Sequence, residues 1–202
     1  MPQSPIERIV IRRLVYQFVS QRVVERIFDQ PLIGNVERGQ YVECMVEFAL
    51  SEQRPQWSLT GTWDPWDLVQ ADSGARIEVK NSAAAQTWTA QSPPLTQAAP
   101  SFDIAARTGY FDTNGWRPAD PPARFADIYI FARNDVADIQ EADHRDPDQW
   151  TFYVVPEVAL PPQKSISLNP LNQLSESVSF DRLSDAVQGA LTGLELKAGR
   201  DS

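Results

Sequence analysis

The side chains of this sequence that are best suited to chemistry are two carboxylates and a lysine. Asp67 is followed, after the turn-forming residues Asp72-Ser73-Gly74, by Glu78-Val79-Lys80. Carboxylates are hard oxygen ligands that suit Mg²⁺, and a bound Mg²⁺ polarises a phosphoryl oxygen and lowers the pKa of a bound water. A neighbouring ammonium can orient that water or stabilise developing negative charge. The combination suits hydrolysis of a phosphodiester.

A strand, a turn and a second strand over residues 63–86 must position these groups. Side chains alternate between the two faces of a strand. Burial of Ile77 and Val79 therefore places Glu78 and Lys80 together on the opposite face. The alternative is an ordinary hairpin whose exposed face carries these two charges.

The register of the hairpin decides whether Asp67 joins the pair. A two-residue loop at 72–73 sets Asp67 opposite Glu78, and a two-residue loop at 73–74 sets it opposite Lys80. Both registers place the three groups on one face. A three-residue loop turns Asp67 away, because a slip of one residue exchanges the two faces.

Lysine is rare in this chain, which has fifteen Arg and three Lys, at positions 80, 164 and 197. An ordinary surface cation at position 80 would more often be Arg here. A compact ammonium at this position indicates a requirement that a guanidinium does not meet.

Asp67 followed by Glu78-Val79-Lys80 resembles the PD-(D/E)xK nuclease superfamily. The resemblance implies an α/β fold, the restriction-endonuclease-like three-layer domain with a mixed central β-sheet flanked by helices. It also implies Mg²⁺, with Mn²⁺ as a substitute, bound by Asp67, Glu78 and the backbone carbonyl of Val79, while Lys80 serves the attacking water. The usual Pro-Asp pair is reversed as Asp64-Pro65, and Asp67 is taken as the ligand because apolar residues follow it directly.

Two flanking residues extend the resemblance over about residues 36–90. Gly39 and Glu43 match a Gly-x-x-x-Glu helix, so Glu43 is a further candidate catalytic and metal-binding residue. Gln86 matches a glutamine on a short helix after the lysine, here expected over 82–88, and is a candidate catalytic residue. The alternatives are exposed surface positions for both side chains, with Glu43 and Glu47 as two solvated glutamates.

We expect one domain over residues 1–202, with a catalytic core at about 36–155. Residues 91–123 are proline-punctuated, and we expect them to elaborate this core and to bury Phe111 and Trp116. Apolar periodicity and β-branched or aromatic runs predict helices over 5–28, 36–52 and 180–196 and strands over 101–105, 124–132 and 150–155.

Charge and composition bear on the partners. The net charge of −9 does not favour strong non-specific DNA binding, but residues 1–30 carry +2, and their arginines are candidates for phosphate contact. The absence of a membrane-spanning apolar run and the single Cys44, expected in the core, indicate a cytoplasmic protein. His144, the only histidine, lies in an acidic segment and is expected to be solvated rather than a metal ligand.

The sequence thus predicts a Mg²⁺-dependent nuclease, by default an endonuclease acting on DNA. It could function as a homodimer or with a partner subunit. The rival interpretation is a non-catalytic interaction or scaffold subunit with a nuclease-like fold. A hydrolase that uses Ser or Cys lacks an evident base.

Overall fold

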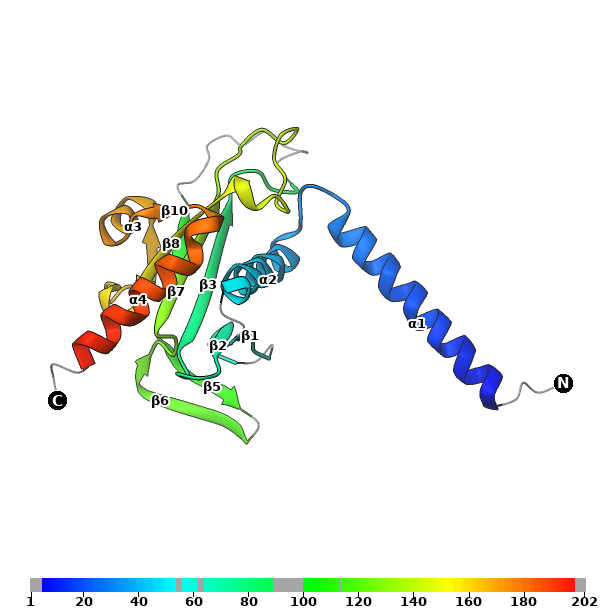
Figure 1. The fold of residues 1–202 in the computed structure, drawn as a ribbon, viewed down its shortest axis with the longest axis horizontal. Coiled ribbons are helices and arrows are strands. Elements are labelled where there is room, and N and C mark those ends of the chain that lie inside the picture. The colour runs from blue at the N-terminus through cyan, green and yellow to red at the C-terminus, as the bar shows by residue number, and fades with distance from the viewer. Residues whose placement is uncertain (1–4, 54–55, 62–63, 89–99, 113, 199–202) are drawn as a thin grey trace.

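A mixed sheet forms the centre of the molecule (Figure 1). The structure is a computed structural model that describes residues 5–53, 56–61, 64–88, 100–112 and 114–198, so Trp63 and residues 91–99 lie outside it. Within the described residues the strand order is β1-β2-β3-β7-β8-β10. Strands β3 (Arg76–Ala83) and β7 (Ile128–Asn134) run parallel, and the other neighbours are antiparallel. The remaining strands are β1 (Trp57–Leu59), β2 (Leu68–Gln70), β8 (Trp150–Pro156) and β10 (Ser177–Val178).

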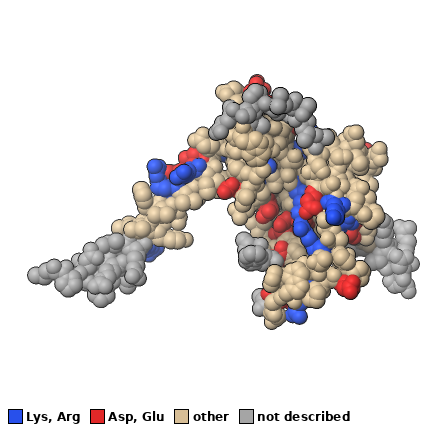
Figure 2. Space-filling model, turned by 180° about the vertical axis from the view of Figure 1, so that it is seen from behind, with Lys and Arg blue, Asp and Glu red and all other residues tan. Residues whose placement is uncertain are grey.

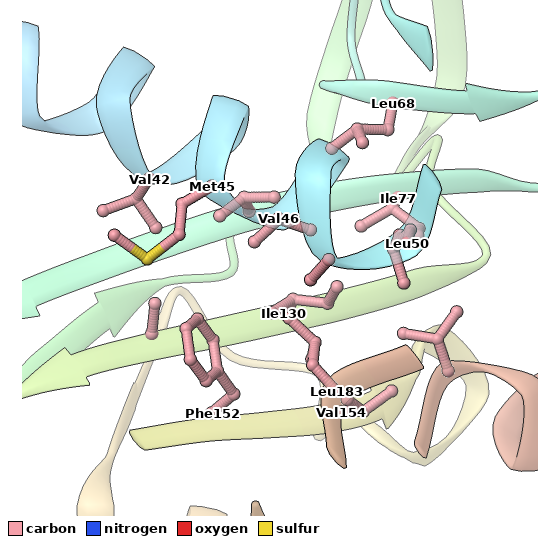
Figure 3. Packing of buried hydrophobic residues seen from close by; sticks show 14 of the residues in the cluster. Val42, Met45, Val46, Leu50, Leu68, Ile77, Ile130, Phe152, Val154 and Leu183 are labelled. Atoms are coloured by element: carbon pink, nitrogen blue, oxygen red, sulfur yellow. The ribbon is translucent and has the colours of Figure 1, made fainter. Parts of the chain in front are cut away.

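Two helices cover one face of this sheet. Helix α2 (Asn35–Gln53) and helix α4 (Leu183–Ala198) match the helices predicted over 36–52 and 180–196, with the 3₁₀ turn η3 (Phe180–Arg182) opening the latter. The apolar stripe of α2 faces inward and meets the sheet (Figure 3). This contact buries Ile77 and Val79, as the alternation of β3 predicts. The central members of this core are Val42, Met45, Val46, Leu50, Leu68, Ile77, Ile130, Phe152 and Leu183.

The opposite face carries a second core and a third layer. Strands β4 (Ser101–Asp103) and β9 (Ser165–Ser167) pair with each other and, with helix α3 (Leu168–Leu174), pack on β7 and β8. Strand β7 is therefore buried on both faces, which explains its unbroken apolar sequence. The α/β fold with a mixed central sheet between helices is confirmed.

Two elements extend from this body. Helix α1 (Pro5–Phe28) matches the predicted helix and projects away from the sheet (Figure 1). Strands β5 (Arg107–Asp112) and β6 (Gly115–Ala123) form a hairpin that the sequence did not predict, because three prolines lie in β6. Phe111 and Trp116 pack on each other there and remain about half exposed, so their expected burial is wrong.

The helix expected over 82–88 is absent from this described segment. Strand β3 instead continues to Ala83, where it pairs with Asn134 of β7, and a turn follows. Strand pairing thus overrides the helix preference of the small residues. Strand β7 begins at Ile128, later than expected. Arg124 lies in the loop before it, where its guanidinium donates hydrogen bonds to the Ile104 and Pro161 carbonyls.

Two further 3₁₀ turns, η1 (Pro147–Gln149) and η2 (Glu157–Ala159), flank β8. No helix in the described part of the chain is both long enough and apolar enough to cross a membrane.

Candidate active site

The paired residues of β2 and β3 have the register that a two-residue loop at 72–73 would give, with Leu68 opposite Ile77. Asp67 lies just before the first of these pairs. The loop has four residues, 71–74, instead of two, but both loops share the same centre and therefore the same register. Gly74 closes the loop with φ +70°, a conformation that favours glycine.

Asp67 lies immediately before β2 and is bonded to β3 twice. Its backbone N–H donates to the Ile77 carbonyl at 2.8 Å, and its Oδ2 accepts from the Val79 N–H at 2.7 Å. The side chain of Asp67 thus occupies the place that a strand partner would take beside Val79. The other carboxylate oxygen of Asp67, Oδ1, is not the acceptor of the Val79 hydrogen bond.

Glu78 and Lys80 share one face of β3 and are hydrogen-bonded to each other, with Lys80 Nζ donating to Glu78 Oε1. Their side chains are only 15% and 21% exposed. An ordinary solvated hairpin face does not describe this pair. Two charges in a partly buried position indicate a requirement other than solubility.

Helix α2 brings Glu43 near enough to Glu78 and Lys80 for their charges to act on it. Burial is the main cause that raises the pKa of Glu43, and the charge of Glu78 adds to it while Lys80 opposes it. Gly39, one turn earlier, faces β3, where a Cβ would lie 3.6 Å from the Asn81 side chain, an ordinary contact distance. Glu47 is not simply a solvated surface glutamate, since its carboxylate accepts a hydrogen bond from the Leu59 N–H at 3.0 Å.

The effect of burial and of neighbouring charges is largest at Asp67, which is influenced by Glu78, Glu43 and Lys80. Burial raises the pKa of Asp67 to about 7, and the negative charges of Glu78 and Glu43 add to the shift. The Val79 N–H and the Lys80 ammonium act in the opposite direction. Asp67 therefore carries a proton for much of the time at neutral pH, and a bound cation would displace it. Figure 2 shows acidic and basic side chains lying side by side on one face of the body.

Gln86 lies in the turn after β3. Its Oε1 accepts from Arg38 Nη1 at 2.7 Å and its Nε2 donates to the Ala83 carbonyl at 2.6 Å. Arg38 Nε also donates to Asn81 Oδ1 at 2.9 Å. These described contacts make Gln86 part of the link between α2 and the end of β3. Its catalytic role stays a prediction, without the helix on which it was expected.

Sequence reasoning missed Arg38 and Tyr129. Arg38 is 4% exposed, and burial lowers the pKa of its guanidinium. Tyr129 is the β7 partner of Glu78, and burial followed by the Glu78 charge raises the pKa of its hydroxyl. Arg38 could have been noticed from the sequence, because it directly precedes Gly39. Tyr129 could not, because its position beside Glu78 depends on the parallel pairing of β3 with β7, which no local pattern reveals.

His144 is fully buried, so its expected solvation is wrong. Its Nδ1 accepts from the Ile33 N–H at 3.0 Å, which requires that Nε2 carries the proton and donates to the Ala85 carbonyl at 3.1 Å. His144 thus joins the α1–α2 connection to the turn after β3. Asp127 Oδ2 accepts a hydrogen bond from the Arg76 N–H at 2.8 Å, at the start of β3.

The residues fit a hard divalent cation by their chemistry. A strand residue points its N–H and C=O to the same side, so the Val79 carbonyl faces the side on which Asp67 lies. Carboxylate and carbonyl oxygens are the ligands that Mg²⁺ prefers, with waters completing its shell. In the described residues, however, no three His, Cys, Asp or Glu side chains lie close enough together to hold a metal ion.

No model of a known protein family matches this chain, and no curated protein is significantly similar to it in sequence.

Proposed function

We propose that this protein is a Mg²⁺-dependent nuclease of the PD-(D/E)xK type that hydrolyses phosphodiester bonds in DNA as an endonuclease. One observation carries the proposal. The Asp67 carboxylate is bonded to the strand that presents Glu78 and Lys80, and burial together with the Glu78 charge raises its pKa to about 7. Carboxylates that repel each other in a partly buried place are stabilised by a shared cation.

In this proposal the chain's own groups divide the work. Asp67, Glu78 and the Val79 carbonyl would hold Mg²⁺, with Glu43 as a further ligand directly or through water. When bound, the ion would supply polarisation of the scissile phosphoryl group and a lowered pKa for a water. Lys80 orients that water and offsets the negative charge that develops on the phosphoryl oxygens. Glu78 accepts a hydrogen bond from the Lys80 ammonium. On metal binding, the Glu78 carboxylate would bind the ion in place of this ammonium.

Supercoiled plasmid DNA tests the proposal. Incubation with Mg²⁺ or Mn²⁺ should yield nicked and then linear product, and EDTA should abolish both. Asp67→Ala and Glu78→Ala should remove cleavage and metal binding together, because they remove the ligands. Folded protein that binds Mn²⁺ yet leaves DNA intact under all conditions would contradict the choice of DNA, and RNA would be the next substrate to test.

A non-catalytic subunit is the second candidate, and one observation favours it. Lys80 is bonded to Glu78 in the described structure, and the acidic side chains do not converge as three metal ligands. A scaffold would retain the Glu78–Lys80 pair as a buried structural contact. Calorimetry at millimolar Mg²⁺ and Mn²⁺ separates the two functions, because a scaffold should bind neither ion.

A further inference from the structure

Helix α1 presents an unusual amount of apolar surface to solvent. A projecting helix has no packing of its own, and most helical stability in proteins comes from an apolar face packed on another element. The large side chains involved are Leu14, Val15, Tyr16, Phe18, Val19, Val23 and Val24, each between 49% and 73% exposed.

The junction between α1 and the body is firmly held. The Phe28 ring packs on Tyr41 at 5.7 Å, and Arg145 Nη1 donates to the Phe28 carbonyl at 3.1 Å. The His144 N–H donates to the Pro31 carbonyl at 2.8 Å. These contacts direct α1 away from its own body (Figure 1), so its exposed apolar side chains are accessible to another molecule.

An apolar groove lies beside this junction. It has a volume of about 330 Å³ and joins α2 to η3. Phe48 stands at its surface, 57% exposed and stacked on Phe180 at 6.5 Å. Cys44, which was expected in the core, is exposed here instead, and that expectation is wrong. The residues that line the groove are Tyr41, Cys44, Met45, Phe48, Arg145, Pro147 and Phe180. Arg145, the charged member of this lining, is ion-paired with Asp143.

The charge of the N-terminal segment indicates what kind of surface would bind α1. Residues 1–30 carry a net charge of +2, which leaves −11 for the rest of the chain. Helix α1 carries Arg22, ion-paired with Glu25, on the same side as Phe18, so its apolar and charged residues are not segregated as they are in helices that lie on membranes. The complementary partner is an acidic protein surface with an apolar groove.

We propose that two copies of this chain exchange their N-terminal helices, with α1 of each copy seated in the Phe48 groove of the other. A second copy offers both the groove and the negative charge that α1 lacks. The exchange uses the same two surfaces twice, so it closes as a two-fold dimer. Phe18 serves as an aromatic anchor in the partner's groove, where buried aromatic side chains contribute most to association.

Sedimentation or light scattering of the full chain tests the dimer. The wild type should have the mass of a dimer at micromolar concentration. Phe18→Glu should weaken association by roughly a hundredfold or more, since it places a charge in an apolar groove. Gln17→Glu adds the same charge at the neighbouring exposed position and should remain dimeric. Circular dichroism should show the same helix content for all three proteins.

Mixing two variants tests the exchange itself. Phe48→Glu spoils the groove and should also give a monomer. A mixture of Phe18→Glu and Phe48→Glu chains should recover dimers, because one intact α1 then meets one intact groove. A monomeric wild type overturns the proposal, as does a monomer that floats with phosphatidylglycerol vesicles. A dimer that Phe48→Glu leaves intact also overturns it, since helices paired only with each other would behave in this way.

Discussion

Lys80 has the most specific role at the scale of single residues. If its ammonium positions the attacking water, its contribution arises in the transition state rather than in DNA binding. Lys80→Ala should therefore keep the fold and DNA affinity while slowing single-turnover cleavage by on the order of a hundredfold or more. Lys80→Arg should rescue poorly, because the planar guanidinium is larger and differently shaped. Cleavage by Lys80→Ala at the wild-type rate would remove Lys80 from the mechanism.

Asp67 should reduce the stability of the folded protein at neutral pH. In the unfolded chain its carboxyl titrates near its ordinary pKa of about 4, whereas in the folded protein it titrates at about 7. Its contribution to the free energy of unfolding is therefore largest below pH 4 and is lost as the pH rises to 7. Asp67→Asn keeps an acceptor for the Val79 N–H and removes this loss.

Denaturant unfolding across the pH range measures this effect. Asp67→Asn should exceed the wild type at pH 8 by on the order of a few kcal/mol, since one pKa unit corresponds to about 1.4 kcal/mol. The gain should shrink toward pH 4. Asp72→Asn changes an exposed aspartate of the neighbouring turn and should stay close to wild type. An Asp67→Asn protein that is less stable than the wild type at pH 8 would show that the ionised Asp67 carboxylate does not destabilise the folded protein.

At the scale of elements, the sequence predicted what local patterns control and missed what distant pairing controls. The stripe of α2 and the alternation of β3 each follow from a regular spacing, and both elements form as expected. The segment after Lys80 reads locally as a helix, but pairing with β7 extends the strand. Arg38 and Tyr129 reach the site only through such long-range contacts. The conjunction of Asp67, Glu78 and Lys80 was predictable because all three depend on one hairpin.

The close packing of α2 on β3 should be necessary for the site. A Cβ at Gly39 would make an ordinary contact with Asn81, so Gly39→Ala should be tolerated and gain up to about 1 kcal/mol of helix stability. The larger Gly39→Val side chain should displace α2 and carry Glu43 away from Glu78, which should weaken Mn²⁺ binding several-fold in calorimetry. Gly189→Val on α4 is the matched control, because a Cβ there meets no atom within 4 Å. Unchanged Mn²⁺ affinity in Gly39→Val would exclude Glu43 from the site.

For the whole molecule, the charge distribution sets how DNA can be bound. The chain carries −9 overall, and the candidate site adds three carboxylates where a phosphate must approach. Phosphate contacts dominate DNA affinity, so the protein without metal should repel the duplex. A divalent cation held by Asp67 and Glu78 would neutralise the local negative charge. DNA affinity should therefore depend on the metal and not on the net charge of the protein.

Fluorescence anisotropy with a short duplex measures this dependence in the Lys80→Ala protein, which binds DNA without cutting it rapidly. At constant ionic strength, millimolar Ca²⁺ should tighten binding at least tenfold relative to EDTA. The Asp67→Ala/Lys80→Ala double variant should show no such gain, because it has lost a ligand while its overall charge has become less negative. If both proteins respond equally to Ca²⁺, the ion acts through general screening. In that case Asp67 and Glu78 do not hold a metal ion that strengthens DNA binding.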